Sequence, residues 1–69
     1  MRHHIMYTFV IQGIRNIKVM DFQEGRILTI SSAELETNLL YKELAGDLAP
    51  FIEKINQGGY DYHPPKGKK

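Results

Sequence analysis

The chain has 69 residues, a formal net charge of +1 and no cysteine. A chain of this length is expected to form one domain with a thin core, because such a domain buries only about 60% of the surface of its unfolded chain. The lack of cysteine excludes disulfides and thiolate metal sites as reinforcement, so we expect a partner subunit to stabilise the fold.

Three strands are predicted in the first half of the chain. Residues 5–12 are rich in β-branched and aromatic side chains and predict a strand that Gly13 ends. Residues 14–22 and 26–30 predict two more strands, with a turn at Gly25 between them. Because short connections join antiparallel neighbours, we expect an antiparallel meander.

Helix is predicted after the strands, where the hydrophobic period changes from two to about 3.6 residues. Ser31 and Glu34 fit a capping box at the start of this region. The apolar positions then trace one face of a helix, which we expect to pack on the sheet. These positions are Leu35, Leu39, Leu40, Leu44, Leu48, Phe51, Ile52 and Ile55.

A break is predicted in the middle of the helical region. Gly46 is suited to end one helix, and Asp47 to cap the next, with Pro50 in its first turn. We therefore expect two helices, at 32–45 and 48–57, and a single kinked helix is the alternative. The fold class is α+β, with a three-stranded meander and helices packed on one sheet face.

The end of the sequence has no hydrophobic periodicity. We assign residues 1–59 to a single small domain and residues 60–69 to a flexible tail rich in Tyr, Pro and Lys. Aromatic rings can stack on bases while lysines contact phosphates. A solubilising tail, or a tail that folds back as an edge strand or over the core, is the alternative. The candidate tail contacts are Tyr60, Tyr62, Lys66, Lys68 and Lys69.

No catalytic, cofactor or metal site is predicted. His3 and His4 are adjacent, so on a strand they point to opposite faces and cannot aim at one metal ion. No motif supplies a base for a nucleophile or a glycine-rich phosphate loop. Met6 opens the strand pattern, and a native start there, with residues 1–5 as an upstream extension, is one interpretation.

The sequence carries no membrane or secretion signal. The longest apolar run, at residues 5–11, is much shorter than the roughly 20 residues that span a bilayer. No signal-peptide pattern is present at the start. We therefore expect a cytoplasmic protein that makes no membrane contact.

Both faces of the predicted sheet are apolar. In the first strand, Tyr7, Phe9 and Ile11 are expected on one face, and Met6 and Val10 on the other. One helical layer covers one face, and an uncovered apolar face usually marks an interface. The alternative is that the second helix or the tyrosine tail covers this face. The candidate interface is Met6, Val10, Ile14, Met20 and Ile27.

These patterns favour a small non-enzymatic protein–protein interaction module or regulator. A homodimer is the simplest assembly, because closed two-fold dimers are the commonest oligomers. The alternative function is nucleic-acid binding through Arg15, Lys18 and Arg26 together with the tail lysines. No cofactor and no small-molecule substrate is expected.

Overall fold

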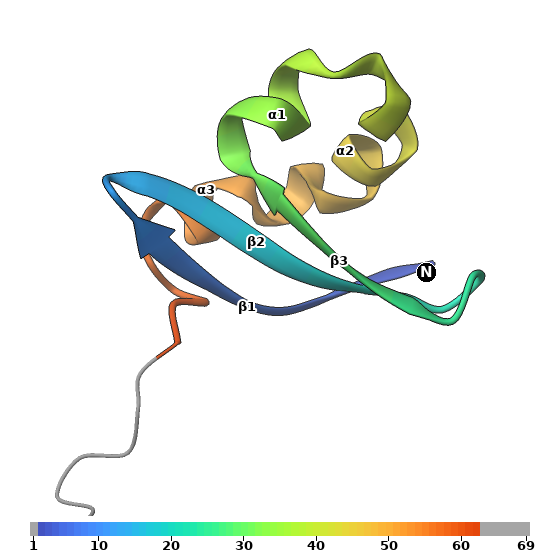
Figure 1. Cartoon of the computed structure of the whole chain (residues 1–69), viewed down its shortest axis with the longest axis horizontal. Helices are drawn as coiled ribbons and strands as arrows, with labels where there is room; N and C mark the ends of the chain where they lie inside the picture. Colours follow the sequence, from blue (N-terminus) through green and yellow to red (C-terminus); the bar gives the residue numbers. More distant parts are fainter. Residues whose placement is uncertain (1, 63–69) are drawn as a thin grey trace, which may run out of the picture.

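The computed structural model describes residues 2–62, and a sheet and a helical layer make up the fold (Figure 1). The sheet consists of three antiparallel strands in the order β1-β2-β3. The predicted α+β class and the meander are therefore confirmed. The strands are β1 (His3–Ile11), β2 (Ile14–Asp21) and β3 (Arg26–Ser31).

A two-residue turn joins β1 to β2. Ile11 pairs with Ile14, which leaves Gln12 and Gly13 as the loop. Both have positive φ, 52° and 79°, as a type I′ turn requires. This turn follows the twist of the flanking strands, so it fixes their register.

The turn between β2 and β3 is organised by an aspartate side chain. Asp21 pairs with Arg26, and its Oδ1 accepts hydrogen bonds from the backbone N–H groups of Gln23 and Glu24, at 3.0 and 3.2 Å. Gly25 has a φ of 65° and donates its N–H to the carbonyl oxygen of Asp21. The predicted turn at Gly25 is thus stabilised by hydrogen bonds from the turn's backbone N–H groups to Asp21.

A β-bulge interrupts the pairing of β1 with β2. Ile5 pairs with Val19 and Tyr7 pairs with Lys18, so Met6 is the extra residue. An extra residue reverses the alternation of side chains between the two faces. Ile5 and Thr8 consequently lie on the same face, and both are buried.

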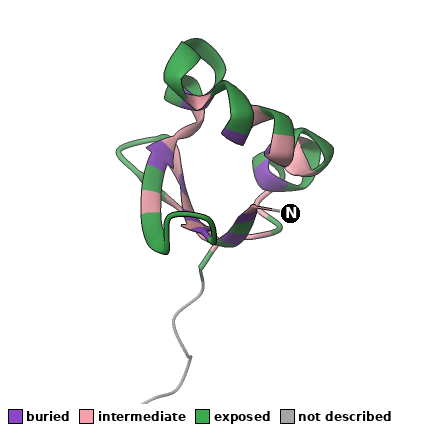
Figure 2. Cartoon of the chain, turned by 90° about the vertical axis from the view of Figure 1, so that its right-hand side faces the viewer, coloured by how far each residue is buried: buried purple, intermediate pink, exposed green. Residues whose placement is uncertain are grey.

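The helical layer is a chain of short segments. The Ser31 hydroxyl accepts a hydrogen bond from the Glu34 N–H at 3.1 Å and begins the first segment, as the capping pattern predicts. Figure 2 shows the segments on one side of the sheet. They are α1 (Ser32–Thr37), η1 (Leu39–Tyr41), α2 (Lys42–Leu48), η2 (Ala49–Phe51) and α3 (Ile52–Asn56).

The predicted helix boundaries, 32–45 and 48–57, are wrong. The first helix ends at Asn38, whose backbone is extended and whose side chain accepts a hydrogen bond from the Leu40 N–H at 2.9 Å. Such local bonding offers the backbone an alternative to helix. Gly46 lies inside α2, and Asp47, predicted as a cap, instead contacts His3 through its carboxylate.

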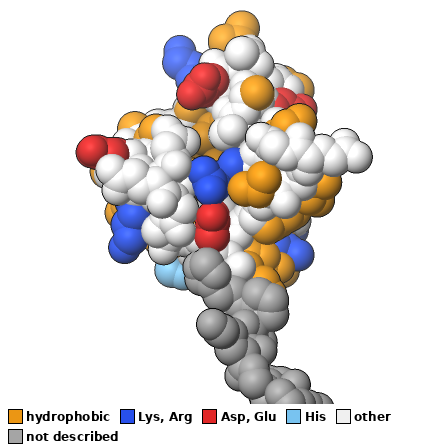
Figure 3. Space-filling model, turned by 90° about the vertical axis from the view of Figure 1, so that its left-hand side faces the viewer, with side chains coloured by type: hydrophobic (Ala, Val, Ile, Leu, Met, Phe, Trp, Pro, Cys, Tyr) orange, Lys and Arg blue, Asp and Glu red, His pale blue; other side chains and the backbone are white. Residues whose placement is uncertain are grey.

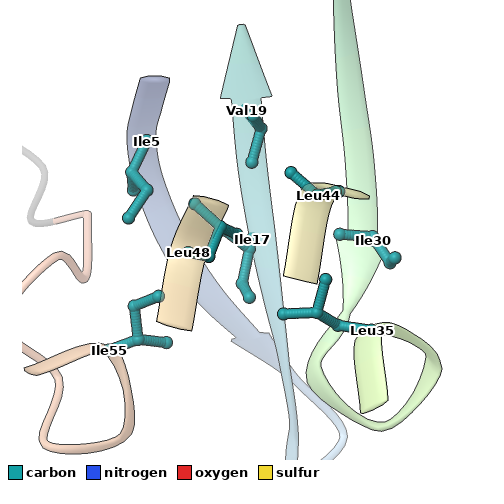
Figure 4. Packing of buried hydrophobic residues seen from close by; sticks show 8 residues of the cluster. All are labelled: Ile5, Ile17, Val19, Ile30, Leu35, Leu44, Leu48 and Ile55. Atoms are coloured by element: carbon teal, nitrogen blue, oxygen red, sulfur yellow. The ribbon is translucent and has the colours of Figure 1, made fainter. Parts of the chain in front are cut away.

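The core lies between the sheet and the helical layer. Its side chains come from all three strands and from the three α-helices, and they point towards one another (Figure 4). Tyr60 and Phe51 pack against this cluster from its margin. The buried members are Ile5, Ile17, Val19, Ile30, Leu35, Leu44, Leu48 and Ile55.

Candidate functional site

The candidate site is the face of the sheet opposite the helical layer, which we call the outer face. Cross-strand partners share a face, so the strand register defines its members. Three rows run across the sheet: His4, Met20 and Ile27; Tyr7, Lys18 and Thr29; and Phe9, Asn16 and Ser31. Ile11 and Ile14 continue this face at the end of the β1–β2 hairpin.

The outer face exposes large hydrophobic side chains. Ile14 and Ile27 leave 52% and 48% of their surface accessible, and Phe22, beyond the end of β2, is also exposed. Seen from the end where β1 turns into β2, hydrophobic side chains gather towards one side of the molecule (Figure 3). Within residues 2–62, the segments of the helical layer all contact the sheet from its other face.

Three of the five predicted interface residues belong to the outer face: Ile14, Met20 and Ile27. The grouping of Val10 with them is wrong, because Val10 pairs with Arg15, on the side of the helical layer. Met6 is the exposed bulge residue itself. The bulge reverses the alternation within β1 and brings Tyr7, Phe9 and Ile11 to the outer face instead.

Aromatic rings cluster around one lysine on the outer face. The centroid of the Tyr7 ring lies 6.1 Å from that of Phe9 and 5.3 Å from that of Tyr62. The Lys18 Nζ lies 5.6 Å from the centroid of the Tyr7 ring. The tilted rings and the ammonium over a ring face are favourable arrangements for these groups.

The segment expected to begin the tail pairs with β1. The Thr8 N–H donates to the Tyr60 carbonyl oxygen, and the Tyr62 N–H donates to the Thr8 carbonyl oxygen, both at 2.8 Å. These bonds form a short parallel bridge beside the sheet. Tyr62 stays exposed while its ring packs on that of Tyr7, so it extends the outer face. The other tail candidates, Lys66, Lys68 and Lys69, lie outside the described residues.

An aspartate holds the same segment to the sheet. Asp61 accepts hydrogen bonds from the Thr8 hydroxyl and from Arg15 Nε and Nη2, the last at 2.8 Å. Arg15 Nη1 also donates to the Asn56 carbonyl oxygen at 3.1 Å. These bonds give the segment from Tyr60 to Tyr62 a fixed place beside β1.

The three sheet cations predicted for nucleic-acid binding do not share a face. Arg15 and Arg26 pair with residues that face the helical layer, whereas Lys18 lies on the outer face. The Arg15 guanidinium already contacts Asp61. A continuous basic strip from these three residues is therefore absent from the sheet.

A buried polar cluster ties the start of β1 to α2. Arg2 donates two hydrogen bonds to Asp21 and one to Glu43, each 2.9 Å long. His3 Nδ1 lies 2.7 Å from Asp47 Oδ2. Hydrogen bonds from Arg2 hold the pKa of Asp21 well below its usual range, against the opposing effect of burial. These contacts fasten the two layers together.

Within residues 2–62, no three His, Asp or Glu side chains are arranged to hold a metal ion. Every buried side-chain nitrogen and oxygen in the same range has a hydrogen-bond partner. The chain from residue 2 to 62 also contains no helix with the length and apolar character that crossing a membrane requires.

A second apolar patch lies on the helical layer, where the sequence pattern predicted core. Leu39 and Leu40 leave 86% and 88% of their surface accessible. The extended backbone at Asn38 rotates η1 out of the helical register, which turns both leucines to solvent. The hydrophobic period alone cannot reveal this break.

No protein-family model, no curated protein and no solved structure matches this chain.

Proposed function

We propose that this protein is a small non-enzymatic interaction module or regulator that docks on another protein through its outer face. The observation that supports the proposal is the group of exposed isoleucines there, with the half-buried rings of Tyr7 and Phe9 between them. The exposed members are Ile11, Ile14 and Ile27. Exposed apolar patches on small proteins mark interaction sites, and aromatic anchors dominate binding energy in such sites. The absence of cysteine is compatible with action in the cytoplasm.

The charge on the outer face limits the kind of partner. Lys18 is the single Lys, Arg, Asp or Glu among the described residues of this face. A partner that offers an apolar surface with one carboxylate opposite Lys18 satisfies both features. A second copy stacked face to face, with its axis near Lys18, brings two ammonium groups together. We therefore propose a different protein as the occupant.

The test combines site-specific crosslinking with binding measurements. A photoreactive phenylalanine analogue replaces Phe9 on the outer face or, as the control, exposed Glu36 on α1. The protein captured from Phe9 and not from Glu36 is then purified and titrated by calorimetry. We expect Ile14→Lys to weaken binding at least about tenfold, because it charges an apolar contact, and Glu36→Lys to leave it unchanged.

Two results would contradict the proposal. Equal capture from both positions would mean that the outer face is not selective. Wild-type affinity in Ile14→Lys would mean that the captured protein binds elsewhere.

A second candidate function, single-stranded nucleic-acid binding, is favoured by one observation. Tyr7, Phe9 and Tyr62 form an aromatic group beside Lys18, and bases stack on such groups while cations contact phosphate. Fluorescence anisotropy with a labelled oligouridine at low salt tests this function. It requires binding that weakens with salt and that Tyr7→Ala reduces. Absence of binding at low salt eliminates it.

A further inference from the structure

We propose that two copies of this chain pair through β3. The paired strands are antiparallel, with a two-fold axis at Thr29, and the product is one continuous sheet of both copies. This surface is distinct from the outer face, so the proposal goes beyond the proposed function and can fail without it. The occupant of the β3 edge is a second copy of this chain.

The two edges of the sheet differ in how far they are closed. The β1 edge is interrupted by the bulge at Met6 and is paired at Thr8 with residues 60–62. Among the described residues, β3 hydrogen-bonds through its backbone to β2 and to no other strand. Figure 1 shows β3 along the near margin of the sheet. One side of β3 therefore presents a row of unpaired N–H and C=O groups.

The β3 edge lacks the features that prevent strand addition. Natural edges are protected by proline, by lysine, by bulges or by a covering segment. β3 contains no proline and no lysine, and its pairing with β2 has no register shift. Its single charge is Arg26, at the first residue. The strand is thus regular and available along its length.

The sequence of β3 is complementary to itself in one register. With Thr29 opposite Thr29 of the second copy, Leu28 lies opposite Ile30 and Ile27 opposite Ser31. Threonine pairs and aliphatic pairs are favourable across antiparallel strands. Arg26 lies beyond the paired stretch, because Ser32 of the second copy begins α1, so no like charges meet across the paired strands. Leu28 and Ile30 both face the helical layer. Their cross-strand contacts in the pair would therefore connect the cores of the two copies at the two-fold axis.

One of the two exposed leucines of the helical layer, Leu40, lies beside β3. Leu40 lines a shallow hollow together with Arg26 and Leu28 of β3. Leu39 and Leu40 are the most exposed large hydrophobic residues among those described. Pairing through β3 brings the leucines of both copies towards the same seam. Their burial there explains why two adjacent leucines face solvent in a single copy.

Single cysteines test the register, because the natural chain has none. Thr29 lies next to its own counterpart at about 4.5–5.5 Å between Cα atoms, within the range of a disulfide. We expect Thr29→Cys to form a disulfide-linked dimer under mild oxidation. Ile27→Cys lies about 13 Å from its counterpart in this register, and Ile14→Cys lies on β2, so neither is expected to crosslink.

A charge substitution tests the seam independently of the outer face. We expect the wild-type protein to sediment as a dimer at micromolar concentration. Leu40→Glu should raise the dimer dissociation constant at least about tenfold, since it charges an apolar contact. The control Ala49→Glu, also exposed on the helical layer, should leave it unchanged. Because Leu40 is solvent-exposed in one copy, neither variant threatens the fold.

The outcomes separate this proposal from the proposed function. A monomeric wild type, or a dimer in which Thr29→Cys does not crosslink, overturns pairing through β3. A dimer that crosslinks through Ile14→Cys also overturns it and identifies the outer face as the contact between copies. The binding of Ile14→Lys to a captured partner tests the proposed function by itself.

Discussion

Arg2, the residue before β1, pairs with Asp21, the last residue of β2. Two hydrogen bonds of 2.9 Å, from Arg2 Nε and Nη2 to the two carboxylate oxygens, form a bidentate pair. Only 1% of the Asp21 side chain is accessible. The same carboxylate organises the β2–β3 turn, so one aspartate connects the start of the chain with both hairpins.

The lowered pKa of Asp21 predicts acid sensitivity. Because folding lowers this pKa, the folded state binds the proton less readily than the unfolded state. The stabilisation is complete above pH about 4 and diminishes as pH falls below it. We expect Asp21→Asn to lower the free energy of unfolding at neutral pH, with a difference from wild type that shrinks below pH about 4. Urea titrations of both proteins from pH 2 to 7 measure this difference, and a constant difference would refute the assignment.

A chain that begins at Met6 is predicted to be much less stable. It lacks Arg2, which binds Asp21 and Glu43, and His3, which contacts Asp47. It also lacks buried Ile5, and loss of such a side chain alone costs about 2–5 kcal/mol. Urea denaturation followed by circular dichroism should show a truncated chain that is unfolded or close to it. A midpoint equal to that of the full chain would mean that residues 2–5 are dispensable.

Leucines with the same predicted role should respond differently to truncation. Leu48 is fully buried and Leu39 is almost fully exposed, although the helical period predicts both as core. We expect Leu48→Ala to cost about 2–5 kcal/mol of unfolding free energy and Leu39→Ala to change it by less than about 0.5 kcal/mol. Chemical denaturation at protein concentrations too low for a dimer to form measures both free energies. Similar costs would indicate that Leu39 packs in the core.

The strands could be predicted from sequence because alternation and turn residues are local signals. Gly13 and Gly25 mark the two turns, and the observed strands begin and end within two residues of their predicted limits. The bulge at Met6 has no comparable signal. The bulge places both Ile5 and Thr8 on the buried side of the sheet. It therefore changes which face each later residue of β1 occupies.

The helix boundaries and the site depended on contacts between distant residues. Gly46 and Asp47 are typical helix-end residues, but both lie inside α2, where the Asp47 carboxylate contacts His3 and caps no helix. Asn38 breaks the helix instead, and this break exposes Leu39 and Leu40. Among residues 2–62, the sheet face opposite the helical layer has a different membership from the predicted one, because the bulge decides which residues of β1 belong to it.

The β1–β2 turn offers a stabilising substitution. Gln12 adopts a φ of 52°, which costs energy for most side chains and less for asparagine. We expect Gln12→Asn to raise the free energy of unfolding by about 0.5 kcal/mol, because asparagine followed by glycine is the preferred type I′ pair. Gly13→Ala, at a φ of 79°, should lower it by about 1 kcal/mol. Thermal denaturation of both variants tests the turn type, and a destabilised Gln12→Asn would contradict it.

The place of Tyr62 on the outer face depends on Asp61. Its carboxylate accepts hydrogen bonds from Thr8 and Arg15, and the flanking backbone pairs with Thr8. We expect Asp61→Ala to cost about 1–3 kcal/mol, because it leaves these partly buried donors without their acceptor. The Thr8 amide donates its hydrogen bond to the Tyr60 carbonyl oxygen. Relative to wild type, Asp61→Ala should accelerate hydrogen exchange of this amide more than that of the Ile17 amide inside the sheet.

The comparison of the two amides separates local release from general destabilisation. If the Asp61→Ala variant accelerates exchange at Thr8 and Ile17 equally, the aspartate stabilises the whole domain and does not specifically hold this segment. If Thr8 alone responds, the segment from Tyr60 to Tyr62 is an adjustable border of the outer face. Binding of a captured partner should then weaken in Asp61→Ala, because Tyr62 no longer lies against Tyr7.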